Sequence, residues 1–280
     1  MAGVVRLVVY AGIVFVLLKI LVWWLEPRMA FYPIRGVQDT PASAGLEFRD
    51  LRIPTDDAET LHAWWIEHPT PRGQVVFFHG NGGNLSLWLG LLVDMRRRGL
   101  SVLAVDYRGY GASTGSASER GLYRDADATL RIFSEKLRRK DVPTIYWGRS
   151  IGSSIAAYAA SRAPALSSVE GPDGLVLDSP FPEVGAILAG NPVMQFLHLF
   201  SSYAFPTSRF LEQHERPLLV VHGDADSIVP FSAGRRVFEH ARSAQKTFAV
   251  MPGADHNDLD HVDPDAYWKA VDAFVADLRR

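Results

Sequence analysis

The longest hydrophobic run of this chain lies at its N-terminus. Between residues 7 and 25 the only charged side chain is that of Lys19. As a helix this run would measure about 28 Å, enough to cross the hydrocarbon core of a bilayer. Trp23 and Trp24 stand at its end, where aromatic rings favour the membrane interface. The pattern therefore predicts a membrane anchor over residues 1–28.

A cleaved signal peptide is the main alternative for this run. No pair of small residues in cleavage spacing follows it, and the Glu26-Pro27-Arg28 sequence is a poor context for signal peptidase. We therefore expect an uncleaved, single-pass membrane helix. The positive charges on its two sides are too evenly balanced to predict on which side of the membrane the rest of the chain lies.

After a connecting segment over residues 29–44, strand and helix patterns alternate to the C-terminus. The first two strands alternate in part, as in an antiparallel pair, and the later ones are continuous apolar runs, as in parallel strands covered on both faces. Residues 45–280 are thus predicted to form one α/β domain with a doubly wound, mostly parallel, eight-stranded sheet. The predicted strands are Leu46–Ile53, Leu61–Glu67, Gln74–Phe78, Ser101–Asp106, Val142–Trp147, Gly174–Leu177, Pro217–Val221 and Lys246–Met251, and the predicted helices are Leu85–Arg98, Ala117–Lys140, Ser150–Ser161, Phe231–Ala241 and Asp263–Leu278.

One segment interrupts this alternation. Residues 183–215 are rich in Phe, Leu and Pro and lie between two late strands. In α/β sheets, ligands bind beyond the carboxyl ends of the strands, and this insertion would lie above them. We interpret it as a small apolar cap over the site; helices that only pack against the domain are the alternative.

Composition narrows the classes of function. The chain has 280 residues, a formal net charge of −2 and no cysteine. It lacks the basic surface expected of a nucleic-acid-binding protein. The absence of cysteine excludes disulfides, thiol catalysis and cysteine-ligated metal.

Residues 148–152 read Gly-Arg-Ser-Ile-Gly and follow an apolar strand directly, with a helix directly after them. This strand, Gly-x-Ser-x-Gly, helix order is typical of a nucleophile elbow, in which the serine hydroxyl stands clear of the sheet on a tight turn. A second match to the same pattern, around Ser113, lies in a glycine-rich loop well after its strand and before its helix. We therefore predict Ser150 as the nucleophile.

A serine nucleophile needs a general base, and His256 is the predicted one. It follows the strand Lys246–Met251 within a short loop. Of the nine histidines, His261 is the nearest alternative, but it lies farther from the strand, beside the final helix. His79 and His222 directly precede glycines at strand ends, where a role in the turn is favoured.

The base needs an acidic partner that holds its ring. Asp224 and Asp226 both follow the strand Pro217–Val221, and Asp178 follows an earlier strand. Spacing alone does not choose among these three aspartates.

Two backbone N–H groups are needed to bind the oxyanion. Ile151 directly follows the predicted nucleophile and supplies the first. The second is expected from the glycine-rich loop at residues 79–84, His-Gly-Asn-Gly-Gly-Asn, with Asn81 as the donor. The loop lacks the Lys-Ser/Thr pair of a phosphate-binding loop.

An acidic cluster near the C-terminus could suggest a metal site. It comprises Asp255, His256, Asp258, Asp260 and His261. Acidic loops of this kind are common, and the chain has no helical His-Glu-x-x-His motif. We expect neither a metal ion nor an organic cofactor.

Taken together, these segments resemble the α/β-hydrolase superfamily over residues 45–280, and more narrowly its membrane-anchored BEM46/ABHD13-type serine hydrolases. The resemblance rests on the anchor, the loop at 79–84, the Asp-Tyr-Arg-Gly-Tyr-Gly sequence at 106–111, the elbow, and the loops at 222–230 and 253–258. In that pattern the acid is the aspartate of His-Gly-x-x-Asp, which is Asp226 here, and the base is His256. The resemblance, and not the spacing, thus selects Asp226.

The expected function is hydrolysis of a carboxylic ester or thioester through a Ser150–His256–Asp226 triad, with a lipid or a lipidated protein as a possible substrate. A peptidase or an acyltransferase could use the same triad. A non-catalytic, membrane-tethered interaction protein is the alternative of a different class.

Overall fold

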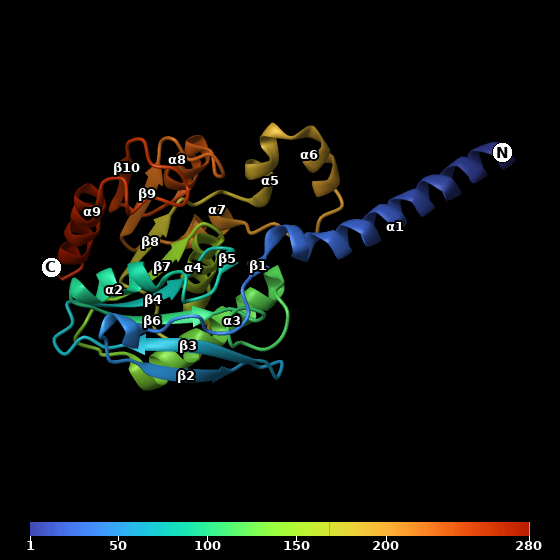
Figure 1. The fold of residues 1–280 in the computed structure, drawn as a ribbon. Helices are drawn as coiled ribbons and strands as arrows, with labels where there is room; N and C mark the ends of the chain where they lie inside the picture. The colour runs from blue at the N-terminus through green and yellow to red at the C-terminus, as the bar shows by residue number, and fades with distance from the viewer. Residues whose placement is uncertain (168, 280) are drawn as a thin grey trace.

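The computed structural model describes residues 1–167 and 169–279, and Figure 1 shows a twisted central sheet flanked by helices, with one long helix projecting from the body. The sheet has eight strands in the order β10-β9-β8-β7-β4-β6-β3-β2. Strands β2 and β3 are antiparallel to their neighbours, and the other neighbouring pairs are parallel. The predicted fold class is confirmed. The strands are β2 (Arg49–Pro54), β3 (Thr60–Ile66), β4 (Gly73–Phe78), β6 (Leu100–Asp106), β7 (Thr144–Arg149), β8 (Gly174–Asp178), β9 (Leu218–Gly223) and β10 (Lys246–Met251).

Helices cover both faces of this sheet and give two hydrophobic cores. Alternate residues of each central strand point to opposite faces, so Val76 and Phe78 of β4 join one core while Val75 and Phe77 join the other. The first core lies under α3, α4 and α8, and the second under α2 and α9. The helices of the body are α2 (Leu89–Arg97), α3 (Glu119–Ile132), α4 (Ile151–Arg162), α5 (Val184–Ile187), α6 (Pro192–His198), α7 (Thr207–Phe210), α8 (Phe231–His240) and α9 (Pro264–Asp277).

The largest differences from the predicted elements lie around residues 117–149. The long helix predicted over Ala117–Lys140 is shorter, because the Ser118 side chain caps its start and a π-helical turn at Phe133–Leu137 follows α3. Strand β7 begins at Thr144, two residues later than predicted. Pro143 has no N–H to donate to a sheet, which explains the later start.

Helix α1 (Ala2–Ala30) is longer than the predicted apolar span and extends away from the body (Figure 1). Among the described residues it is the one helix whose length and composition suit a membrane crossing. After it, β1 (Tyr32–Pro33) pairs in parallel with β5 (Gly82–Gly83). This two-stranded sheet was not predicted, and it attaches the connecting segment to the glycine-rich loop.

The insertion between β8 and β9 contains α5, α6 and α7. Helix α7 packs against α4 in the body. Figure 1 shows α5 and α6 standing apart from the sheet, beside the end of α1 that adjoins the body. This placement is compatible with the predicted cap, whose role stays a prediction.

Candidate active site

Ser150 occupies a sharp turn between β7 and α4. Its φ of 56° and ψ of −120° lie outside the regions that residues with a Cβ usually populate. The flanking glycines are required by close packing, because a Cβ on Gly148 would lie 2.0 Å from the Gly152 carbonyl oxygen, and one on Gly152 would lie 2.0 Å from that of Phe78. The predicted elbow geometry is therefore present, and it presents the serine at the carboxyl edge of the sheet.

The structure brings Ser150, His256 and Asp226 together. Nε2 of His256 lies 3.0 Å from the Ser150 hydroxyl oxygen, and Nδ1 lies 2.8 Å from Oδ2 of Asp226. Both distances are within hydrogen-bond range. Three side chains from separate loops thus form one continuous hydrogen-bonded chain.

The Asp226 carboxylate is held by several donors. Its Oδ1 accepts hydrogen bonds from the amides of Ile228 and Val229, at 3.0 and 2.7 Å. Burial alone would raise its pKa, but hydrogen bonds from His222, His256 and Val229 outweigh burial and hold the pKa well below the usual value. The group is therefore ionised at neutral pH and can stabilise a charged imidazole.

The two other candidate acids lie elsewhere. Asp224 accepts a hydrogen bond from the Gly253 amide, at 2.6 Å, and so stabilises a turn. Asp178 is fully buried, and its Oδ2 accepts hydrogen bonds from the Trp147 indole and the Tyr267 hydroxyl, at 2.9 and 2.7 Å. Neither carboxylate contacts His256.

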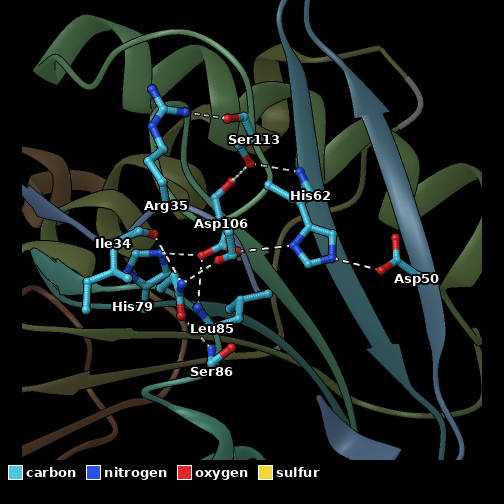
Figure 2. Close-up of polar contacts among 12 residues, drawn as sticks. Ile34, Arg35, Asp50, His62, His79, Leu85, Ser86, Asp106 and Ser113 are labelled. Atoms are coloured by element: carbon cyan, nitrogen blue, oxygen red, sulfur yellow. Dashed lines mark hydrogen bonds and ion pairs between the residues drawn. The ribbon is translucent and has the colours of Figure 1, made fainter. Parts of the chain in front are cut away.

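Ser113 and His261, the alternatives for nucleophile and base, lie in different environments from the triad. The buried Ser113 hydroxyl donates to the Asp106 carbonyl, at 2.7 Å, and accepts from the His62 amide, at 2.8 Å (Figure 2). The His261 ring is exposed, with Nδ1 3.4 Å from Asp260. Among the described residues, no group of three or more His, Asp or Glu side chains is arranged to hold a metal ion.

A buried network around Asp106 holds the glycine-rich loop. Figure 2 shows the Asp106 carboxylate between His62, His79 and the Leu85 backbone. Its Oδ1 accepts from the Leu85 amide, at 2.9 Å, and its Oδ2 lies 3.2 Å from Nδ1 of His62. The Tyr110 hydroxyl donates to the Asn81 carbonyl, at 2.8 Å. The loop backbone is thereby fixed next to the serine.

Both predicted oxyanion donors border the cavity in front of Ser150. Ile151 is the first residue of α4, where an N–H has no partner within the helix. Asn81 lies between Gly80 and the short strand β5, and its side-chain amide donates to the Ala30 carbonyl, at 3.2 Å. Their binding of an oxyanion stays a prediction.

Arg149 is a residue of the site that the sequence analysis did not identify. Its buried guanidinium donates to the His256 carbonyl, at 3.1 Å, and pairs with Asp260 at 2.7 Å. It also lies 5.4 Å from the centre of the Trp88 ring. The histidine loop is thereby tied to the elbow. The sequence did contain a signal for this role. Arg149 is a charged residue directly after an apolar strand, and an arginine buried at such a position needs partners that neutralise its charge.

A cavity of about 580 Å³ lies in front of the serine, within the usual size of small-molecule sites. Apolar side chains dominate its walls. They come from the body, from the insertion and from α1, and include Val22, Leu25, Met29, Phe181, Val184, Ile187, Leu188, Met194, Leu197 and Phe205. The cavity suits an apolar substrate group.

Known proteins resemble this chain in sequence and in fold. A family model described as serine aminopeptidase, S33, matches residues 69–216 and 211–263. The uncharacterized membrane protein YNL320W of Saccharomyces cerevisiae is 30% identical over 86% of this chain and 84% of its own length, and the bem46 protein of Schizosaccharomyces pombe is 28% identical over 85% and 80%. The lysophosphatidylserine lipase ABHD12 of Macaca fascicularis is 30% identical over 66% of this chain and 50% of its own. Among solved structures, an esterase of Pyrococcus furiosus superimposes with a TM-score of 0.73 at 21% identity, over 89% of this chain and 98% of that one.

Proposed function

Because the chain belongs to the α/β-hydrolase family, in its BEM46/ABHD-like branch, we propose that it is a serine hydrolase that cleaves carboxylic ester or thioester bonds. The observation that carries this proposal is the hydrogen-bonded chain from Ser150 through His256 to Asp226, with distances of 3.0 and 2.8 Å. In this proposal α1 anchors the enzyme in a membrane by a single pass.

The reaction begins when the Ser150 oxygen attacks the acyl carbonyl carbon and its proton passes to Nε2 of His256. Asp226 accepts the Nδ1–H hydrogen bond and stabilises the resulting imidazolium. The amides of Asn81 and Ile151 bind the oxyanion. The tetrahedral intermediate then expels the alcohol or thiol, which takes the proton from Nε2, and water releases the acid from the acyl-enzyme by the same route.

The walls of the cavity favour an acyl substrate over a peptide. An aminopeptidase needs an acceptor for the ammonium group of its substrate. Glu26 is the carboxylate among the residues that line the cavity, and it already accepts hydrogen bonds from Ser202. The apolar residues fit a hydrocarbon chain.

A fluorophosphonate probe tests the proposal on the full chain in detergent. We expect the probe to modify Ser150, identified by mass spectrometry, and the protein to hydrolyse p-nitrophenyl esters or acyl thioesters faster than aminoacyl p-nitroanilides. Ser150→Ala should abolish both the labelling and the hydrolysis, whereas Ser161→Ala, at the exposed end of α4, should retain the labelling and the hydrolysis. An unlabelled, folded wild-type protein would exclude the serine mechanism, and faster anilide cleavage would favour a peptidase.

A further inference from the structure

One face of α1 packs against the body although most of the helix is exposed. Val22 is 5% exposed, and Leu18 and Leu25 are partly buried. Positions 18, 22 and 25 fall on one side of a helix, and Met29, one turn further along the same side, is 44% exposed. Leu21, on another side, is exposed. The anchor thus has a defined face toward the catalytic domain.

This face forms a wall of the substrate cavity. Val22, Leu25 and Met29 border the same space as the serine hydroxyl. Met194 and Leu197 of α6 also line it. An acyl chain in the cavity would therefore lie between the anchor and the insertion.

A polar latch joins these two parts. The Glu26 carboxylate accepts hydrogen bonds from the Ser202 amide, at 2.9 Å, from the Ser202 hydroxyl, at 2.6 Å, and from the Ser201 hydroxyl. Charge-assisted hydrogen bonds are among the stronger ones in proteins. The latch fixes α6 next to α1.

The side of α6 away from the cavity is also apolar. Val193 and Phe196 of α6, and Leu199 directly after it, are 66%, 52% and 72% exposed. Just beyond α6, the Phe200 ring lies 5.5 Å from that of Phe15 in α1. Phe15 precedes Val22 by seven residues, which corresponds to about 10 Å along the helix axis. Helix α6 therefore lies beside the part of α1 that is suited to the hydrocarbon core.

We propose that α6 and the segment of α1 from Phe15 to Trp24 are embedded together in one membrane leaflet, and that the cavity between the insertion and α1 takes the acyl chain of its substrate directly from that leaflet. This inference rests on the proposed ester hydrolysis at Ser150. With Trp23 and Trp24 at the interface, α6 would reach the depth of about 5–10 Å that is typical of interfacial helices. The substrate is then an ester that resides in the bilayer and presents its carbonyl at the interface.

The depth of α6 can be measured directly, because the chain has no cysteine and accepts a single labelling site. An environment-sensitive fluorophore is attached to Leu199→Cys in full-length protein, which is reconstituted in phosphatidylcholine vesicles carrying doxyl groups on their acyl chains. We expect strong quenching of the fluorophore at position 199 and little quenching at Thr70→Cys. Thr70 is exposed and precedes β4, so it lies at the amino-terminal ends of the parallel strands, opposite to Ser150. Equal quenching at the two positions would overturn the inference.

The role of α1 in the cavity is tested by chain-length preference. We expect Val22→Trp to lower the ratio of palmitoyl- to butyryl-ester kcat/KM by about tenfold, because the larger side chain occupies space that the longer acyl chain needs. Tenfold corresponds to about 1.4 kcal/mol in transition-state binding. Leu21→Trp adds the same side chain outside the cavity and should keep the wild-type ratio. Labelling by the fluorophosphonate shows whether the Trp variant is folded. If it is not, Val22→Met replaces it in the same assay.

The two hypotheses fail in different ways. A labelled Val22 variant with the wild-type ratio would overturn the inference while ester hydrolysis stands. A wild-type protein that hydrolyses neither ester and resists the probe would overturn both.

Discussion

The backbone strain at Ser150 provides a quantitative test of the elbow. A residue with a Cβ at φ 56° and ψ −120° is strained, and such positions cost on the order of 1–3 kcal/mol. Ser150→Gly removes the Cβ and therefore the strain energy, whereas Ser150→Ala keeps the Cβ and the strain energy. Glycine loses about 0.5–1 kcal/mol relative to alanine through its greater freedom in the unfolded chain. The Gly variant should therefore be more stable than the Ala variant by about 1 kcal/mol.

Thermal unfolding of the full chain in detergent, followed by tryptophan fluorescence, measures this difference. For a domain of this size, 1 kcal/mol corresponds to a melting temperature difference of about 2–4 °C. Lys269, exposed within α9, serves as the control, since there the Gly variant should melt below the Ala variant by a similar amount. A Ser150→Gly protein that melts at or below Ser150→Ala would refute the claim that the elbow stores strain.

Three further predictions concern the acids and the packing of the elbow. Asp226→Asn should lower ester kcat by about 10⁴-fold, because an amide does not hold the productive tautomer of the base, whereas Asp224→Asn should stay near wild type in the same kinetic assay. Burial raises the pKa of Asp178 from 3.8 to about 6, against the opposing effect of a nearby arginine, so the folded protein binds this proton more tightly than the unfolded chain. The stability of the wild-type protein should therefore fall as the pH rises from about 4 to about 6. Over the same range the melting temperature of Asp178→Asn should rise relative to that of the wild type. A difference in melting temperature that does not change with pH would contradict this. Gly152→Ala should cost about 3 kcal/mol in stability, because its Cβ would meet the backbone oxygens of Phe78 and His79. Gly90→Ala, with open space around it, should be neutral or stabilising in the same melting experiment.

The fold could be predicted because its strands are marked locally. The parallel strands are continuous apolar runs and the first two strands alternate in part, and these two patterns together located every strand of the main sheet within a few residues. The two-residue strands β1 and β5 were missed because they contain only Tyr32–Pro33 and Gly82–Gly83, too short for any periodicity.

The candidate site could be predicted in part. The elbow around Ser150 and the loop with His256 each follow a strand directly, so local sequence identified both. The acid could not be chosen by spacing, because three aspartates follow strand ends. Packing separates them: Asp178 is buried against Trp147 and Tyr267, and Asp224 caps a turn, which leaves Asp226 next to the imidazole.

The order of residues along the chain fixes where the apolar runs lie, and therefore the long N-terminal helix, the sheet and the loops that carry polar groups. That α1 also forms a wall of the cavity follows from the packing of the folded chain. Helix α1 carries apolar side chains all round, so nothing in its composition distinguishes Val22, which borders the cavity, from Leu21, which does not. That distinction depends on the Glu26 latch and on contacts with residues nearly two hundred positions away, and such contacts exist only after the chain has folded.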